Sequence, residues 1–542
     1  MSYRSVRGAD GLSEAYAAFA RYDTPYESAV IDDFSGGVMT GVFPGDKNAS
    51  EIINMEPVGR MLSSTCAPVA AFSSSTVSGP VHFSYCSDGL WLFRKGNTLY
   101  AFQNGELSVV GAAGQFTSDK TAIYHAGDRF YILDGDAIYM VDRELNLTQP
   151  EQYIPTCYTD VSDDGTVKTE AEKPNLFCRY IEIVLAVESV PMPSRTLPTD
   201  IAYDPTYIRI WDASGTELGD SQFNFENGEI YFFGFYSQKF VVRLKLIESE
   251  DMSKLSYTSL CKKREILVCP KRILSLPEGR GFLYYGGESG AQIIMLRPNP
   301  VYGFGYLSEN NIIRKDYGQI ISSVVEYSDG YLVFSAETIK KMAVSEDESG
   351  TPVFQFESFK SDFGSDMPGS VCGFDDKIIF ANSQGGVFYI NKFGIEERDV
   401  SRHISSVIEQ GEKGFFSHTS AEYDAAAAVC AFGKYMLTVG NITYIWDYTA
   451  RLPSATQSRE DENKMVWTLN DVVTPSTYLL QIMRKLYFID QTTGDIRCLP
   501  GGVSGLDTIA SRVTTAESDL GTNGKKRFFL SMCVIAPQAR SR

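Results

Sequence analysis

Residues 88–110, DGLWLFRKGNTLYAFQNGELSVV, decide the fold of this chain. A Gly/Asp turn precedes a strand of alternating apolar residues, and a second turn leads into an aromatic-rich strand. Asn104-Gly105, between LYAF and ELSVV, is a strong signal for a two-residue hairpin. The stretch therefore predicts antiparallel strands rather than helices.

The same pattern recurs along the chain. Further copies start at Gly127, Arg280, Asp329, Asp375 and Gly433, and a weaker one at Tyr478. Neighbouring copies lie about 40 to 58 residues apart, the length of one four-stranded propeller blade with its loops. The long gap after Gly127 shrinks to that length once roughly 110 inserted residues are removed. Because a single blade cannot cover both its faces, a ring of blades buries them. We predict an all-β fold, a β-propeller of about seven blades, with six or eight compatible with the same pattern.

The period of two within each copy indicates which side chains face the next blade. Leu90 and Leu92, and likewise Tyr131 and Leu133, are expected on one face of their sheets. Five aromatic residues suggest either a sugar platform or packing between blades, and we favour packing. These residues are Trp91, Tyr139, Tyr389, Trp446 and Phe488.

The spacing divides the chain into four parts. Residues 1–30 form an N-terminal arm, partly helical because 11–22 is rich in helix formers, and residues 31–150 form the first part of the propeller. Residues 151–265 form an inserted β-sandwich-like platform domain, with strand-like runs such as RYIEIVLAV and KFVVRLKLI. Residues 266–542 complete the propeller and include a closing strand at 528–536. We expect the insertion to lie on one face of the ring.

Composition narrows the class of protein. The chain has 49 Lys and Arg against 68 Asp and Glu, a net charge of −19. This charge argues against a protein that binds nucleic-acid phosphates and against one that docks on an anionic membrane surface. No apolar run reaches the roughly 18 residues of a membrane span, and the start of the chain has no apolar signal region. The ten cysteines are scattered without a CxxC pair, so buried free thiols in a reducing compartment are expected.

The sequence gives no motif for catalysis. The four histidines, at 82, 125, 403 and 418, lie outside GxSxG, HExxH or HxH patterns. Ser87 to Trp91 resembles the sialidase Asp-box only at the wrong spacing, and Gly286-Gly287 and Gly501-Gly502 lack the residues of a phosphate loop. The acidic runs VSDDG and SEDESG do not match the calcium-loop spacing. We therefore predict no catalytic, cofactor-binding or metal-binding residues, no cofactor, and a protein that is not an enzyme.

Several stretches resemble a family of bacteriophage propeller proteins that form the tail nozzle or head-to-tail connector of short-tailed and related phages. The opening segment from Ile31 carries Gly36, Gly37, Pro44, Asn54 and Gly59 at positions like the family's. YIPTCYTD and KPNLF look like the entry to the family's platform domain, and SENNIIRKDYGQ looks like the start of one of its blades. The most characteristic matches are FGSDMPGSVCGFDDKIIFANSQGGVFYI and YDAAAAVCAFGKYMLTVGNITYIWDY, followed by Trp467.

This resemblance covers 34–467 discontinuously and consists of turns and strands. The chain ends sooner than is common in the family, and the segment 287–300 departs from the family's pattern. The resemblance implies a structural virion protein of the tail, present in the host cytoplasm during assembly. Copies would form a homo-oligomeric ring, a hexamer, lining the channel for genome ejection. Partners would be other tail or connector proteins, and DNA would pass through the lumen without specific binding. Two alternatives stay open: a receptor- or glycan-binding propeller of the virion, and a glycosidase with two carboxylates in one pocket.

Overall fold

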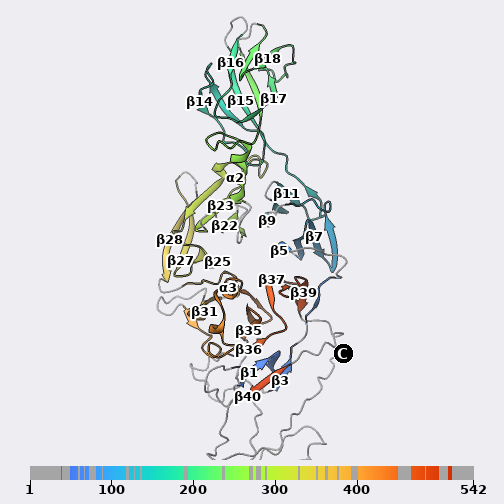
Figure 1. Ribbon diagram of the computed structural model, residues 1–542, viewed down its shortest axis with the longest axis vertical. Coiled ribbons are helices and arrows are strands. Elements are labelled where there is room, and N and C mark those ends of the chain that lie inside the picture. Colours follow the sequence, from blue (N-terminus) through green and yellow to red (C-terminus); the bar gives the residue numbers. More distant parts are fainter. Residues whose placement is uncertain are drawn as a thin grey trace, which may run out of the picture.

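The computed structural model describes residue 38 and residues 49–515 with breaks, the longest of which are 73–80, 392–400, 450–465 and 500–510. Among these residues, seven sheets stand in a ring, and two further sheets form a body beyond its edge (Figure 1). Six of the seven ring sheets have four strands, and the seventh has six. The chain is thus an all-β propeller with seven blades, as the repeat predicts.

Each blade is an antiparallel meander whose first strand lies innermost, because the first strands of successive blades contact one another around the ring. Blade 1 consists of β5 (Val81–Ser87), β6 (Leu90–Lys95), β7 (Thr98–Gln103) and β8 (Glu106–Val110). Blade 2 consists of β9 (Thr121–Ala126), β10 (Arg129–Asp134), β11 (Ile138–Val141) and β12 (Leu147–Thr148). Blade 3 consists of β21 (Ile273–Ser275), β22 (Phe282–Gly286), β23 (Gln292–Leu296) and β24 (Ile312–Asp316).

The second half of the ring follows the same plan. Blade 4 consists of β25 (Ser323–Tyr327), β26 (Gly330–Phe334), β27 (Ile339–Glu346) and β28 (Pro352–Lys360). Blade 5 consists of β29 (Cys372–Phe374), β30 (Lys377–Asn382), β31 (Gly386–Asn391) and β32 (Ser401–His403). Blade 6 consists of β33 (Ala427–Ala431), β34 (Lys434–Val439), β35 (Ile442–Asp447) and β36 (Trp467–Asn470). Blade 7 consists of β37 (Pro475–Ile482), β38 (Lys485–Asp490), β39 (Ile496–Leu499) and β4 (Val69–Ala70).

The ring is closed by pairing the two ends of the chain. The outer strand of blade 7 is β4, from the N-terminal part, and it pairs antiparallel with β39 at Cys498↔Val69 and Arg497↔Ala70. The closing strand expected at 528–536 lies outside the described residues, as does the N-terminal arm at 1–30. In the part of the chain that the structure describes, closure therefore depends on an N-terminal strand.

Both faces of each blade are buried against its neighbours. All six residues of β6 are buried, with Leu90 and Leu92 in the cluster shared with blade 2, while Trp91 and Phe93 lie in the cluster shared with blade 7. The predicted facing of Leu90 and Leu92 is therefore confirmed. Trp91, Trp446 and Phe488 are buried as well, which confirms packing for these three aromatic residues. Asn104 and Gly105 both have positive φ, 53° and 87°, as a type I′ hairpin turn requires.

Residues 151–265 contain two sheets that pack face to face, as predicted. The larger has the order β14 (Val167–Glu170), β13 (Thr156–Val161), β15 (Tyr180–Val187), β20 (Gln238–Leu246) and β17 (Tyr203–Trp211). The smaller has the order β16 (Ser194–Thr196), β19 (Glu229–Phe232) and β18 (Phe223–Glu226). Alternate residues of β15 and β20 point into the space between the sheets, including Ile183, Phe240 and Val242.

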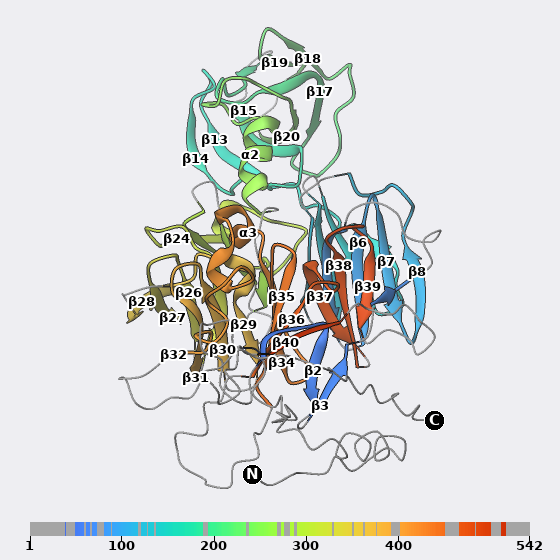
Figure 2. The same ribbon diagram turned by 60° about the horizontal axis from the view of Figure 1, so that its bottom comes forward.

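The insertion extends outward from the ring's edge, beside blades 2 and 3, in the plane of the ring (Figures 1 and 2). The expectation that it lies on one face of the ring is wrong. The connection from the outer strand β12 leaves the ring at its rim, and the long loop of blade 3 reaches out to meet it. A helix, α2 (Tyr257–Leu267), returns the chain to blade 3. Ser256 precedes the helix and caps its N-terminus, because its Oγ accepts a hydrogen bond from the Ser259 backbone N–H, at 3.1 Å.

At the opposite end of the molecule, blade 6 is widened by two more strands (Figure 1). β1 (Ala49–Ile53) pairs in parallel with β36, and β40 (Arg512–Thr515) pairs antiparallel with β1. β2 (Met55–Val58) and β3 (Met61–Ser64) form a separate hairpin next to them. The remaining short elements are α3 (Ser420–Asp424), η2 (Glu309–Asn311), η3 (Pro368–Ser370) and η4 (Phe415–Ser417). Among the described residues, no helix is long and apolar enough to cross a membrane.

A buried ion pair joins blades 1 and 2. Arg94 Nη1 on β6 lies 3.1 Å from Asp134 Oδ1 on β10, and the two side chains are 1% and 4% exposed. Arg94 also donates to the Thr121 hydroxyl and to the carbonyls of Gly96 and Phe116. Breaking a buried pair leaves an uncompensated charge, which is more costly than the loss of an exposed pair.

Arg94→Ala should therefore destabilise the protein by about 3–5 kcal/mol, because the buried Asp134 carboxylate then loses the compensating positive charge of Arg94. Arg129→Ala is the matched control, because Arg129 pairs with Asp128 while both side chains are more than half exposed, at 51% and 82%. We expect this control to lower stability by less than about 1 kcal/mol. Chemical denaturation followed by tryptophan fluorescence measures both, and equal losses would contradict a buried pair.

Candidate functional site

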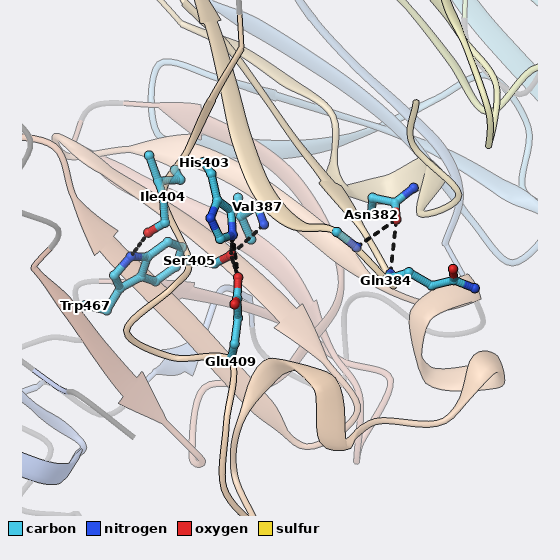
Figure 3. A network of polar contacts seen from close by, with 9 residues as sticks. Asn382, Gln384, Val387, His403, Ile404, Ser405, Glu409 and Trp467 are labelled. Carbon is cyan, nitrogen blue, oxygen red and sulfur yellow. Dashed lines mark hydrogen bonds and ion pairs between the residues drawn. The ribbon is translucent and has the colours of Figure 1, made fainter. Parts of the chain in front are cut away.

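The cluster that most resembles a catalytic site lies where blade 5 meets blade 6. His403 Nε2 contacts Glu409 Oε1 and lies 3.1 Å from Ser405 Oγ (Figure 3). Ser405 Oγ donates to Glu409 Oε1 at 2.6 Å and accepts from the Val387 backbone N–H at 2.8 Å. The serine, the histidine and the carboxylate of a hydrolase are thus close together.

Their geometry does not suit nucleophilic catalysis. In a Ser-His-acid triad the hydroxyl and the carboxylate meet opposite nitrogens of the imidazole, whereas here both meet Nε2. The Ser405 hydroxyl already donates its proton to the carboxylate. The side chains also lie against Gly386, where a Cβ would come within 2.8 Å of His403 Nε2, so the space beside them is filled. The next residue, Ile404, accepts a 2.7 Å hydrogen bond from Trp467 Nε1 of blade 6 (Figure 3). The cluster therefore fixes one blade to the next.

A second histidine is buried beside α3. His418 Nε2 lies 2.8 Å from Tyr444 Oη, and this hydroxyl donates to the Lys413 carbonyl at 3.0 Å. The network therefore assigns the proton to His418 Nε2, which donates to the tyrosine. His418 Nδ1 lies 3.6 Å from Glu422 Oε2. Burial lowers the pKa of His418 from its ordinary value, although Glu422 opposes the shift. The imidazole is therefore neutral at neutral pH.

In the described part of the chain, the side chains form neither a metal site nor a disulfide. No group of three or more His, Cys, Asp or Glu side chains there is placed to hold a metal ion. Seven cysteines fall within this part, and all are free thiols. Burial raises the pKa of the Cys157 thiol to about 12, which keeps it protonated and unreactive at neutral pH.

The junction between the insertion and the ring is held by both apolar and polar contacts. One apolar cluster runs from Tyr124 and Leu133 of blade 2, through Phe240 and Val242 of the insertion, to Leu296 of blade 3. The insertion and the ring therefore share one continuous core. Because such a core is packed as densely as a crystal, the two parts resist relative motion.

Asn175 lies at the centre of this junction and is fully buried. Its Nδ2 donates to the carbonyls of Gly305 and Tyr153, at 2.8 and 2.9 Å. Its Oδ1 accepts from the backbone N–H groups of Phe177 and Leu307, at 3.2 and 3.3 Å. One side chain thus joins the entry to the insertion with the loop 297–311 of blade 3.

Aromatic rings extend this junction toward the surface. Tyr153 stacks on Tyr302 with ring centroids 4.0 Å apart, and Tyr306 lies 5.1 Å from Tyr153. The Tyr153 hydroxyl contacts both oxygens of Glu172, at 3.0 and 3.2 Å. Burial and the hydrogen bond to Glu172 raise the pKa of Tyr153, which keeps it a hydrogen-bond donor.

The outer face of the larger insertion sheet carries the residue types that dominate protein contacts. The Arg243 guanidinium lies 4.5 Å from the centre of the Trp211 ring and donates to Glu182 Oε1 through Nε and Nη2, at 3.0 and 2.7 Å. Tyr180 and Tyr207 lie 5.2 Å apart on the same sheet, and Arg209 on β17 is exposed. Tyr, Trp and Arg held in place in this way are characteristic of interface hot spots.

Neither Asn175 nor the outer face is predicted from the sequence, which carries no functional motif at these positions. Apolar and polar residues alternate in the sequences of β15, β17 and β20, and this alternation predicts which side chains point into the core. It does not predict that Trp211, Arg243 and Glu182 lie together, because their strands are distant in sequence and become neighbours only in the folded sheet.

Comparisons with known proteins give likeness in fold only. No protein-family model matches the sequence, and no curated protein matches it. Among solved structures, the BBS1N chain from a complex with ARL6DN is 10% identical, with a TM-score of 0.34, and the match covers 80% of this chain and 98% of that chain. The Pan2 WD40 domain of Neurospora crassa is 7% identical, with a TM-score of 0.36, over 81% and 96%. The computationally designed Ika8 protein is 10% identical, with a TM-score of 0.30, over 78% and 96%. Similarity at this level gives no argument about function.

Asn175→Ala should loosen the insertion from the ring, because two backbone carbonyls and two N–H groups each lose a hydrogen bond at a buried position. We expect a loss of about 1–3 kcal/mol and faster hydrogen exchange in 151–177 and 297–311. Asn224→Ala, at an exposed position of β18, is the control. Unchanged exchange at both segments in the Asn175 variant would contradict its role.

His418 should make stability depend on pH. Because its pKa is lower in the folded chain than in the unfolded chain, protonation favours unfolding. The contribution is fully present above the ordinary histidine pKa of about 6.5 and is lost as the pH falls below it. His418→Gln retains a donor for Tyr444, so the fall in melting temperature between pH 7 and 5 should be smaller than in the wild type. An equal fall in melting temperature between pH 7 and 5 in the wild type and the variant would refute this prediction.

Proposed function

We propose that this chain is a non-enzymatic structural protein of a bacteriophage tail. Six copies would form a ring that lines the channel for genome ejection. The observation that carries the proposal is the continuous core of the insertion and blades 2 and 3, which makes the insertion a stiff extension of the ring. The resemblance to tail nozzle and connector proteins supplies the viral context.

A channel wall must keep its shape while other parts bind to it. In this chain the polar clusters support that requirement, because the Ser405–His403–Glu409 and Asn175 groups use their hydrogen bonds to join neighbouring parts. None of these groups presents an unused nucleophile or base toward a cavity. This use of polar side chains favours scaffolding over catalysis.

The two ends of the long axis offer surfaces for different neighbours (Figure 1). One end is the insertion, with its outer face of Trp211, Tyr207 and Arg243. The other is the widened sheet of blade 6, whose β40 is an edge strand with backbone groups unpaired on one side among the described strands. A body with distinct contacts at opposite ends can join one tail part to another.

The net charge of −19 suits a protein that DNA must pass without adhering. Counter-ion release by clustered Lys and Arg drives DNA binding, and this chain has an acidic surplus instead. Where the acidic residues face the lumen, their repulsion of the DNA phosphates keeps the genome free to move. Three of the five aromatic residues considered for a sugar platform are buried, so these three do not provide a glycan-binding surface.

Assembly provides the test. Mass photometry of the purified protein should show hexamers, alone or once a neighbouring tail protein is added, and mass spectrometry should find the chain in purified virions. The double variant Trp211→Ala, Arg209→Glu should shift the population toward monomers, because the outer face loses an aromatic anchor and gains a repulsive charge. Arg129→Glu, an equal charge change at an exposed site of blade 2, should assemble normally. Absence of the chain from virions, together with monomers in every condition, would refute the proposal.

A further inference from the structure

A hollow of about 260 Å³ lies where blades 6 and 7 meet. Its walls come from α3, from the β34–β35 turn at Gly440, from the start of β37 and from the turn after β38 at Gln491. In a four-stranded meander, the turns between the second and third strands and the connections between blades lie on the same face of the ring. The hollow therefore opens on that face and is independent of the insertion.

One wall of the hollow carries a negative charge. The Thr419 backbone N–H and hydroxyl both donate to Glu422 Oε2, at 2.8 and 2.9 Å. These bonds, with the backbone bond first, lower the pKa of Glu422, so its carboxylate is ionised at neutral pH. The other oxygen, Oε1, lies against Gly440, and it accepts no hydrogen bond from any residue that the structure describes.

No cation among the described residues balances this charge. Glu422 pairs with no lysine or arginine there, and the one basic group beside it is His418. His418 is neutral at neutral pH because burial lowers its pKa, and its proton is directed toward Tyr444. The carboxylate thus retains a full charge and a free acceptor position at the wall.

The rest of the lining suits a short alkyl stem. Ala421, Ala425 and Pro475 provide apolar contacts, while Ser476 and Gln491 provide polar groups. Gly440 has φ of +56°, and a Cβ there would collide with the Glu422 carboxylate, so glycine keeps this side of the hollow open. Since a water molecule takes about 30 Å³ of liquid volume, the hollow is large enough for an amine of four or five carbons.

We infer that this hollow binds an alkylammonium group, with Glu422 Oε1 accepting its hydrogen bond and the alanine and proline walls covering its stem. The group is either a free amine or the side chain of a lysine presented by another protein. In both cases the same two features recognise it, a fixed carboxylate and an apolar wall. The site is separate from the surfaces proposed for assembly, so the test of ammonium binding and the test of the tail function are independent of each other.

Saturation-transfer NMR on the full-length protein tests the site, with n-butylammonium as the probe and n-butanol as its uncharged analogue. We expect transfer to the butyl chain of the ammonium and little transfer to the alcohol at the same concentration. Glu422→Gln keeps the size of the side chain and its bonds to Thr419 but removes the charge. It should weaken binding roughly 10- to 100-fold, as expected for the loss of a hydrogen bond to a charged group.

Two further variants separate the site from general effects of charge and folding. Glu412→Gln changes the same charge at an exposed position in the same connection and should bind like the wild type. Ser476→Leu fills the hollow and should abolish binding while leaving the melting temperature nearly unchanged, because residue 476 is exposed. Equal transfer to butanol and butylammonium, or full binding by Glu422→Gln, would overturn the inference.

A lysine capped at both ends by amide groups distinguishes the two sources of the ammonium. If a partner's side chain is the ligand, the capped lysine competes with n-butylammonium at least as well as the free amine does. If free amines are the ligand, the capped lysine competes more weakly because its backbone meets the walls. Both results support ammonium recognition, and failure of both compounds to bind overturns it.

Discussion

Burial of both faces of each blade is the constraint on which the rest of this structure depends. A four-stranded sheet with apolar side chains on both sides is not stable in water unless each side meets another sheet. In β6 the even positions pack toward blade 2 and the odd positions toward blade 7, so that strand alone requires two neighbours. Seven blades satisfy this requirement in a closed ring, and the pairing of β39 with β4 provides the last contact.

The insertion extends the same principle beyond the ring. Its two sheets bury their inner faces against each other, and the resulting core merges with the space between blades 2 and 3. The Asn175 side chain of the insertion then satisfies a backbone carbonyl and a backbone N–H of loop 297–311 of blade 3 at a buried position. Because apolar and polar contacts act together there, the platform is a rigid extension of the ring, which is the mechanical property that the proposed tail function needs.

The polar side chains follow a related logic. Arg94 and Asp134 join blades 1 and 2, the His403 cluster and Trp467 join blades 5 and 6, and each group is satisfied by partners in the neighbouring element. Glu422 differs, because it lines a hollow and no cation among the described residues balances its charge. The contrast between satisfied groups at the blade junctions and this unbalanced carboxylate is what distinguishes a structural contact from a binding site in this molecule.

The sequence by itself determined a propeller of six to eight blades and the position of the insertion along the chain, because alternation and turn residues are local signals. Asn104-Gly105 specifies its hairpin whatever lies around it, and the repeat length specifies a blade. The sequence also placed residues 151–265 as a separate pair of sheets. Only the tertiary structure decided that the ring closes through β4, that the insertion leaves from the rim, and that Trp211, Arg243 and Glu182 share a face. It alone decided that Glu422, Gly440, Pro475 and Gln491 surround one hollow. These features depend on which distant strands become neighbours, and packing of the whole chain, not any local pattern, sets that choice.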